Sequence, residues 1–154
     1  MMQLTDVMAT NVLSVAPDTQ LGDAARRMVE ADVGAAVVLD ASGDLAGVIT
    51  ERDLMRCVSD ATDPATPVDQ RMTQHVLTAA PDTNIAEAMA LMVDGHFRHL
   101  PVVNDAGHVI GIVSMRDLMA YTSLRLRGGN LGGDDDLDPA EVIATIFRMR
   151  TGAA

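Results

Sequence analysis

The 154-residue chain has very few aromatic residues: no Trp, one Tyr and two Phe. A core without aromatics must be filled by aliphatic side chains, and 48% of the residues are hydrophobic, among them eleven Met. We therefore expect an aliphatic core in which Met fills the gaps between branched side chains. The chain also lacks the aromatic surfaces on which nucleic-acid bases could stack.

Positive charge is scarce, and lysine is absent: eleven Arg stand against twenty-two Asp and Glu, so the net charge is −11. An acidic surface repels the phosphate backbone of DNA and RNA, and we expect no nucleic-acid partner. Arg suits fixed, bidentate recognition of a phosphate better than Lys does. The few Arg are therefore the first residues to consider for binding a phosphorylated small molecule.

A single cysteine, Cys57, excludes an intramolecular disulfide and a metal cluster built on cysteines. We interpret it as a core or helix residue with no neighbour in the sequence that would activate it. No apolar run approaches about 18 residues, and no basic stretch leads into an apolar segment at the N-terminus. We expect neither a membrane span nor a signal peptide, and a cytoplasmic location is the simplest interpretation.

Internal duplication is the main feature that the chain does have. Residues 8–55 align without a gap on residues 72–119, at an offset of 64, with 17 identities in 48 positions. The identities include the run Ala-Pro-Asp-Thr, two glycines and the run Arg-Asp-Leu-Met. A unit of about 50 residues is marginal on its own, so we expect the two copies to pack against each other.

Each copy predicts the same order of elements, β-α-β-β-α. The apolar residues of the first helix recur at i, i+3, i+4 and i+7, as one face of a helix requires, and Thr19 and Thr83 are the expected N-caps. Two apolar strands follow, joined by a turn containing Gly43 or Gly107. The expected strands cover 11–15, 35–40 and 45–50, then 75–79, 99–104 and 109–114. The helix faces comprise Leu21, Ala24, Ala25 and Met28, then Ile85, Ala88, Met89 and Met92.

The last helix of each copy begins with a hydroxyl residue followed three positions later by an aspartate. These pairs are Thr50 with Asp53 and Ser114 with Asp117. Each pair resembles a capping box. The start of a helix also offers backbone N–H groups and a favourable dipole to an anionic ligand. Both interpretations stay open, because a residue at a helix start can cap the helix and contact a ligand.

The C-terminal part of the chain differs from the repeats. Residues 128–137 are rich in Gly and Asp and predict a flexible linker. The following residues, 138–151, predict an amphipathic helix, with Asp138 as N-cap, Pro139 at the first helical position and Glu141 at N3. Its apolar side must cover its own domain, a second subunit or a client protein.

Catalytic and metal-binding motifs are missing from the sequence. It contains no G-x-S-x-G, no P-loop, no H-E-x-x-H and no Cys/His pair with an orienting partner. His75, His96 and His108 lack the spacing of metal ligands, so we expect them at the surface. The acidic run within 134–138 lacks the Gly and the terminal Glu of an EF-hand, and we interpret it as a solvated linker.

Each copy contains the same pattern near its end: Gly, two apolar residues, Thr or Ser, two variable residues and Asp. A duplicated unit with this pattern resembles a cystathionine β-synthase (CBS) domain. Two in tandem resemble a Bateman module, and the resemblance covers Leu4 to about Leu126. It implies an α/β (α+β) fold in which two repeats pack with pseudo-two-fold symmetry, followed here by the C-terminal helix. On this basis we expect repeat 1 at 1–62 and repeat 2 at 63–127.

The resemblance also implies a regulatory protein that binds an adenosine-containing nucleotide in the cleft between the repeats. AMP, ADP or ATP are the first candidates, followed by S-adenosylmethionine, NAD(H) and cyclic di-AMP. The only metal expected is Mg²⁺ accompanying ATP. Modules of this family commonly form disc-like homodimers, so a homodimer is expected here.

Roles for individual residues follow from their positions in the family motif. Asp53 and Asp117 correspond to the aspartates that bind the ribose hydroxyls. Thr50 and Ser114 correspond to the hydroxyl residues that contact ribose or phosphate. The residue before the aspartate often faces the phosphates, and it is Arg in both copies, Arg52 and Arg116.

A second family feature is a basic pair just before the middle strand's apolar-Pro-Val run, where it binds phosphate. In the second repeat this pair is Arg98 and His99, followed by Pro101. The first repeat has Gly34 and Ala35 in the corresponding places. We therefore expect one well-equipped phosphate site and one weak or empty one, and the sequence leaves open which Asp shares a site with Arg98.

Three functions are consistent with these patterns. The first is a non-enzymatic sensor that binds an adenine nucleotide and signals through a conformational or dimer change. The second is a ligand-free dimerisation or interaction scaffold whose C-terminal helix docks on a client protein. The third, favoured least because no catalytic motif is present, is a small enzyme acting on nucleotides.

Overall fold

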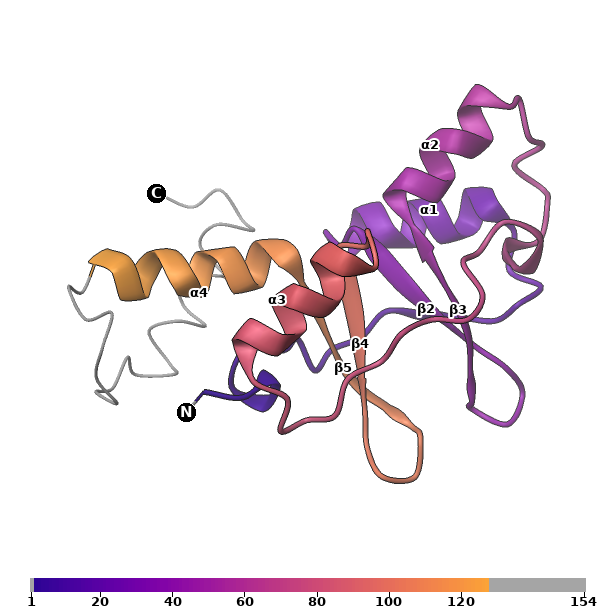
Figure 1. Cartoon of the computed structure of the whole chain (residues 1–154). Helices are drawn as coiled ribbons and strands as arrows, with labels where there is room; N and C mark the ends of the chain where they lie inside the picture. The colour runs from indigo at the N-terminus through magenta and orange to yellow at the C-terminus, as the bar shows by residue number, and fades with distance from the viewer. Residues whose placement is uncertain (1, 128–154) are drawn as a thin grey trace. The chain divides into compact units, whose positions relative to one another are not determined.

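The computed structural model describes residues 2–127, so the predicted linker at 128–137 and the predicted helix at 138–151 lie outside the described residues. The chain has the mixed α/β architecture that the sequence predicts, with helices and small sheets (Figure 1). Its contacts form two compact units. One unit contains 11–77 and 104–110, and the other contains 2–10, 78–103 and 111–127.

The first repeat supplies a three-stranded sheet and two helices to its unit. Strand β2 is central, parallel to β1 and antiparallel to β3. The expected strands at 35–40 and 45–50 are thereby confirmed. The elements of this unit are β1 (Ser14–Val15), α1 (Leu21–Glu30), β2 (Ala35–Leu39), β3 (Leu45–Thr50), α2 (Glu51–Ser59) and the short 3₁₀ helix η2 (Val68–Gln70).

The core of this unit is aliphatic, as the composition predicts. The apolar face of α1 packs against β2 and β3, and Cys57 of α2 and Val68 of η2 complete the cluster. Cys57 is buried within a helix, as expected. The core side chains are Val15, Leu21, Ala24, Met28, Ala36, Val38, Ile49, Cys57 and Val68.

The second repeat supplies a two-stranded sheet, β4 with β5, and two helices that pack against each other. Here too the expected strands at 99–104 and 109–114 are confirmed. The elements of the unit that contains them are η1 (Leu4–Asp6), α3 (Ile85–Asp94), β4 (His99–Val103), β5 (Val109–Ser114) and α4 (Met115–Arg127).

The strand predicted at 75–79 is wrong, because it is reduced to one isolated parallel bridge between Ala79 and Val102. In the first repeat, the backbone N–H of Val37 donates to the carbonyl of Leu13. The equivalent residue in the second repeat is Pro101, which has no N–H to donate. The proline thus removes one rung of the ladder, and the paired segment shrinks to a single bridge.

The expected N-caps are also wrong by one residue, because α1 follows Gln20 and α3 follows Asn84. The hydroxyl oxygen of Thr19 accepts from the backbone N–H of Ala16 and so closes the preceding turn instead. Asn84 takes the cap of α3, where its side-chain oxygen accepts from the N–H of Glu87 at 2.9 Å.

The interpretation of Met as core filler holds for two residues and fails for two others. Met28 and Met92 are buried, with exposed fractions of 3% and 1%. Met55 on α2 and Met119 on α4 are exposed to 72% and 57%, because they lie on the sides of these helices opposite to the buried positions. The three histidines expected at the surface, His75, His96 and His108, are exposed.

In each unit a segment from the start of one repeat extends the sheet of the other repeat. Ala9 forms an antiparallel bridge with Ile112 of β5, and Thr73 forms the equivalent bridge with Val48 of β3. Both bridges carry two backbone hydrogen bonds of 2.9–3.0 Å. Residues 2–10 therefore group with the second repeat, although they belong to the first repeat along the chain.

None of the helices within residues 2–127 combines the length and the apolar character that a membrane crossing would need.

Candidate functional site

The start of α2 is closed by a reciprocal pair of hydrogen bonds between Thr50 and Asp53. The carboxylate Oδ2 of Asp53 accepts from the backbone N–H of Thr50 at 2.9 Å and from its hydroxyl at 2.8 Å. The Thr50 hydroxyl oxygen accepts from the backbone N–H of Asp53 at 3.3 Å. The capping box that the sequence predicts is thus present, and it holds the Asp53 side chain in one orientation.

The start of α4 repeats this geometry with Ser114 and Asp117. The N–H of Ser114 donates to Asp117 Oδ2 at 3.0 Å, and the N–H of Asp117 donates to Ser114 Oγ at 3.1 Å. Asp53 and Asp117 are the two buried charged residues among those that the structure describes, with exposed fractions of 9% and 1%. A carboxylate is costly to bury unless it is hydrogen-bonded, which both boxes provide.

The first turn of each of these helices is fastened to the residue just before the middle strand. The backbone N–H of Glu51 donates to the carbonyl of Gly34 at 3.0 Å, and the N–H of Met115 donates to the carbonyl of Arg98 at 2.8 Å. In the first repeat the strand register agrees, because Ala35 is paired with Thr50. Within one unit, Arg98 and His99 therefore lie beside the box of Ser114 and Asp117.

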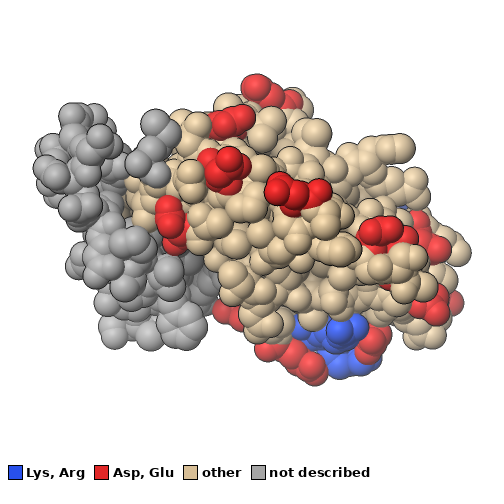
Figure 2. Space-filling view, turned by 90° about the horizontal axis from the view of Figure 1, so that it is seen from below, with Lys and Arg blue, Asp and Glu red and all other residues tan. Residues whose placement is uncertain are grey.

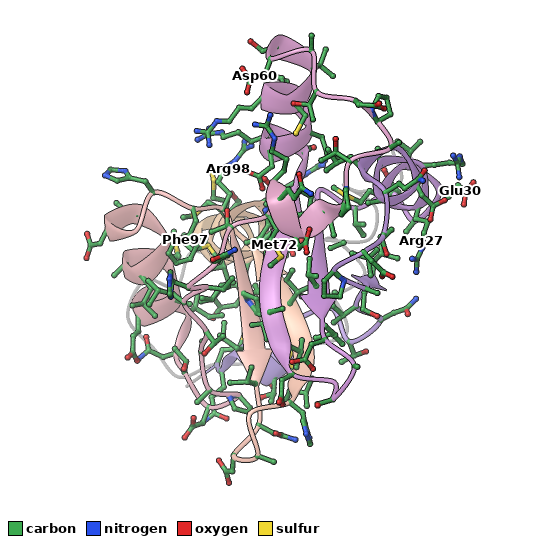
Figure 3. All side chains as sticks on the ribbon, turned by 90° about the vertical axis from the view of Figure 1, so that its right-hand side faces the viewer. Arg27, Glu30, Asp60, Met72, Phe97 and Arg98 are labelled. Carbon is green, nitrogen blue, oxygen red and sulfur yellow. The ribbon has the colours of Figure 1, made fainter. Side chains whose placement is uncertain are left out.

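The basic residues predicted for the site differ in exposure. Arg52, Arg98 and Arg116 are exposed, and His99 is partly buried. Phe97 and Arg98 succeed each other where the chain enters β4 (Figure 3). Two of these arginines, Arg98 and Arg116, belong to the same unit, the one that contains α4.

Pro101 has a structural role in this region. Its side chain is buried, and its carbonyl accepts from the N–H of Ala79 at 3.0 Å. The proline thus lies in the interior of β4, two residues after the partly buried His99.

The first repeat offers a different surface at the same place. Gly34 and Ala35 stand where the second repeat has Arg98 and His99, and neither carries a charge. The box of Thr50 and Asp53 therefore has Arg52 as its neighbouring cation, without the basic pair. The two boxes match each other in backbone geometry but differ in the charge around them.

Two methionines beside the motif glycines were not identified from the sequence. A Cβ atom added to Gly47 would meet the side chain of Met72 and the carbonyl of Thr73, and one added to Gly111 would meet the side chain of Met8. Met72 is labelled in Figure 3, and Thr73, the next residue, forms the bridge with Val48 of β3. The sequence did contain a signal for this contact, because Met8 and Met72 occupy equivalent positions in the two copies, as do Gly47 and Gly111. The motif glycine thus serves a close approach of two chain segments.

A buried, oriented carboxylate next to a helix N-terminus is suited to binding the two hydroxyls of a ribose, because it accepts hydrogen bonds from both. Exposed guanidinium groups a few residues away are suited to binding phosphate. Within residues 2–127, no three His, Cys, Asp or Glu side chains are grouped so that they could share a metal ion. The carboxylates of the boxes and the nearby guanidinium groups are groups that can bind a polar small molecule.

Comparison with known proteins gives consistent results. The sequence model of the family described as CBS domain matches residues 4–60 and 68–123. An uncharacterised 17.7 kDa protein of Acidianus ambivalens is 36% identical over 116 residues, which are 75% of this chain and 70% of that protein. The CBS domain-containing protein YhcV of Bacillus subtilis is 34% identical over 119 residues, covering 77% of this chain and 84% of YhcV.

Enzymes are among the relatives. The inosine-5'-monophosphate dehydrogenase of Methanocaldococcus jannaschii is 32% identical over 114 residues, which are 74% of this chain but 22% of the dehydrogenase. The matched part is 84% of YhcV but only 20% of the Arabidopsis thaliana protein CBSCBSPB1.

Two solved structures extend the comparison. The CBS-domain protein ATU1752 of Agrobacterium tumefaciens superposes with a TM-score of 0.73 at 32% identity, covering 78% of this chain and 92% of that one. The protein CBSX2, solved in complex with AMP, superposes with a TM-score of 0.69 at 28% identity, covering 82% and 99%.

Proposed function

Because this chain belongs to the CBS domain family and contains two copies of the domain, we propose that it is a regulatory module that binds an adenosine-containing nucleotide. The observation that supports this most directly is the pair of buried, oriented aspartates, each at the start of a helix beside an arginine. A related structure, CBSX2, was solved with AMP bound. AMP, ADP and ATP are therefore the first ligands to test.

The proposed roles of the residues follow the geometry of the second repeat. Asp117 accepts hydrogen bonds from the ribose hydroxyls, and Ser114 both caps α4 and contacts the ribose or phosphate. Arg98, His99 and Arg116 bind the phosphate groups, because the fixed link between Met115 and Arg98 keeps them beside the ribose-binding carboxylate. Pro101 supports the basic pair from inside β4.

The first repeat supplies a weaker version of this site. Thr50 and Asp53 have the same box, and Arg52 is the cation next to it. Without a basic pair at Gly34 and Ala35, a phosphate meets fewer donors there. We propose one phosphorylated nucleotide per chain at low ligand concentration, bound mainly by residues of the second repeat.

Ligand binding is proposed to act by shifting the population of conformations or of dimers. A ligand can shift such an equilibrium only by its difference in affinity for the two states. Binding is therefore expected to change either the dimer fraction or the exchange of backbone amides away from the boxes. We propose a homodimer as the signalling form, which multi-angle light scattering with and without nucleotide tests directly.

The second candidate function is a ligand-free interaction scaffold. It is favoured by the missing basic pair in the first repeat and by the capping bonds, which already engage the hydroxyl and the carboxylate of each box. The relationship to a dehydrogenase shows that the CBS pair also occurs within an enzyme, of which this chain matches 22%. For this chain we propose a regulatory role without catalysis.

A thermal-shift panel with AMP, ADP, ATP, S-adenosylmethionine, NADH and cyclic di-AMP distinguishes sensor from scaffold. A ligand that binds only the folded state stabilises it in proportion to the logarithm of its concentration over Kd. At 100 times Kd this amounts to about 2.7 kcal/mol, a readily measured rise in Tm. If no nucleotide shifts the Tm at millimolar concentration, the sensor proposal is wrong and the scaffold replaces it.

A further inference from the structure

The unit that contains the first repeat has five arginines, and neighbouring groups engage three of them. The remaining two, Arg52 and Arg56, form no ion pair or side-chain hydrogen bond with any other residue of 2–127. The engaged ones are Arg26, which pairs with Asp23 at 2.6 Å, Arg27, which donates to the carbonyl of Ser14 at 2.9 Å, and Arg71, which pairs with Asp60 at 3.2 Å. Arg27 and Asp60 are labelled in Figure 3.

Arg52 and Arg56, the arginine row, lie on the same side of α2. Residues four apart share a helix face and are about 6 Å apart along the axis. Both arginines are exposed, and two like charges at this spacing disfavour a helix slightly. The helix dipole favours a cation in the last turn, where Arg56 lies, but disfavours one in the first turn, where Arg52 lies. Helix stability therefore does not explain the row.

The row begins next to the first box, which Thr50 and Asp53 form. An α-helix turns about 100° per residue, so Arg56 lies about 60° around α2 from Asp53, and Arg52 about 100° in the same direction. The exposed acid of the first turn, Glu51, lies about 140° around the helix from Arg56. The bonds from Thr50 hold the Asp53 carboxylate at the box. The row thus leads away from the carboxylate along one side of α2.

The second repeat lacks this row. Arg116 occupies the position equivalent to Arg52, but Ala120, which is 5% exposed, occupies the position equivalent to Arg56. The duplicated fold therefore does not require an arginine at this place. Positive charge is scarce in the chain, and on the face shown in Figure 2 acidic side chains are spread widely while the basic ones gather in one place. Two adjacent arginines without an acidic partner among residues 2–127 are suited to binding an anion.

We propose that Arg56 is a specificity-determining residue of the first box and that, together with Arg52, it binds the terminal phosphate of a nucleoside diphosphate. This inference rests on the proposed function, in which Asp53 holds the ribose. Gly34 and Ala35 provide no cation for the phosphate next to the ribose. A second phosphate extends further from the ribose and meets the guanidinium groups of the row, whose planar donors match phosphate oxygens. The first box therefore prefers a diphosphate to a monophosphate.

Hydrogen exchange of the full-length protein, followed by mass spectrometry during separate titrations with AMP and ADP, tests the preference. The amides of α2 and α4 report on the two boxes separately, because local opening is measured segment by segment. The concentration that gives half of the full protection of α2 should be about tenfold lower for ADP than for AMP, as expected for one more hydrogen bond between charged groups. At α4, where Arg98 lies beside the box, the two concentrations should agree within about threefold.

The variant Arg56→Ala assigns the preference to one side chain. The ADP concentration for half protection of α2 should rise about tenfold, to the value for AMP, and the AMP concentration should change less than about twofold. Arg56 is exposed and alanine favours a helix, so the variant should fold. Arg56→Lys should recover part of the loss, because it keeps the charge without the planar donors. The control Arg26→Ala, which removes an arginine already paired with Asp23 on α1, should leave all four concentrations unchanged.

Three results would overturn the assignment of Arg56 and leave the proposed nucleotide site of the second repeat intact. They are equal concentrations of AMP and ADP for half protection of α2, an unchanged ADP concentration in Arg56→Ala, and protection of α4 alone. Protection of neither helix at millimolar AMP or ADP would contradict the proposed function itself, and the role of Arg56 with it.

Discussion

The backbone N–H of Met115, the first residue of α4, donates to the carbonyl oxygen of Arg98 at 2.8 Å. This bond joins the only basic pair before a middle strand within the described residues to the box formed by Ser114 and Asp117. The same bond in the first repeat, from Glu51 to Gly34, joins the box to an uncharged residue.

Replacing Arg98 by Ala should weaken phosphorylated ligands and spare adenosine. A hydrogen bond to a charged group contributes about 1.5–3 kcal/mol, so the Kd for AMP should rise about tenfold or more. Adenosine has no phosphate for Arg98 to bind, and its Kd should stay within about twofold. Titration calorimetry with both ligands measures the difference.

Arg26→Ala is the matched control for Arg98→Ala. Arg26 is exposed and pairs with Asp23 at 2.6 Å on the surface of α1, and it is far in sequence from both boxes. The Arg26→Ala variant should leave the Kd for AMP and the Kd for adenosine unchanged. Equal losses for AMP and adenosine in Arg98→Ala would show that Arg98 supports the fold and does not bind the phosphate.

The capping boxes should contribute to stability independently of any ligand. Thr50→Ala and Ser114→Ala each remove one cap, and we expect each to lower the free energy of unfolding by about 1 kcal/mol. Urea denaturation followed by circular dichroism measures both. Ser42→Ala serves as a control, because Ser42 contributes its backbone N–H, which the variant keeps, to the bond with Asp40.

The two motif glycines should respond differently to a compensating change. Gly47→Ala and Gly111→Ala each place a Cβ against a methionine, and overpacking of this kind costs about 1–3 kcal/mol. Met8→Ala should restore most of the stability of Gly111→Ala, because the nearest backbone atom there, the carbonyl oxygen of Ala9, is 3.3 Å away.

Met72→Ala should restore less of the stability of Gly47→Ala. The carbonyl oxygen of Thr73 is only 2.7 Å from the added Cβ atom, and a backbone atom cannot move aside as a side chain can. Thermal unfolding of the two double variants measures the difference. Equal recovery in both would show that the backbone contact does not limit substitution at Gly47.

The end of α3 should be stabilised by a glycine at position 96. His96 has a φ of 56°, in the left-handed region, and terminates α3 through a bond from the N–H of Phe97 to the carbonyl of Met92. Glycine adopts this conformation without the steric cost of a Cβ atom. His96→Gly should raise the free energy of unfolding by up to about 1 kcal/mol, because the left-handed conformation costs an L residue roughly 1–2 kcal/mol and the greater freedom of glycine in the unfolded chain offsets part of this gain.

The neighbouring glycine gives the opposite expectation. Gly95 has an ordinary helical φ of −84°, and a Cβ atom there would meet the ring of Phe97. Gly95→Ala should therefore lower the stability even though alanine favours a helix. A stabilising Gly95→Ala would mean that the Phe97 ring moves freely, and it would contradict this explanation of the pair.

Much of this protein could be predicted from the sequence. The duplication at an offset of 64, the four main strands and the two capping boxes depend on local patterns, because the turn glycines, the apolar runs and the Thr/Ser-to-Asp spacing act within a few residues of each other. The candidate residues Asp53 and Asp117 were identified from the same local signals, and their proposed role in binding awaits the experiments above.

Other features arise from contacts between residues far apart in the chain, which no local pattern predicts. Residues 8–9 extend the sheet of the second repeat and residues 72–73 that of the first, and this decides why the motif requires Gly47 and Gly111. The strand predicted at 75–79 is shortened because Pro101 has no N–H to donate to it. Pro101 lies more than twenty residues further along the chain, so no local pattern reveals this effect. Repeated sequence specified two similar folding units, whereas long-range backbone pairing determined which chain segments each unit contains and which box lies beside Arg98.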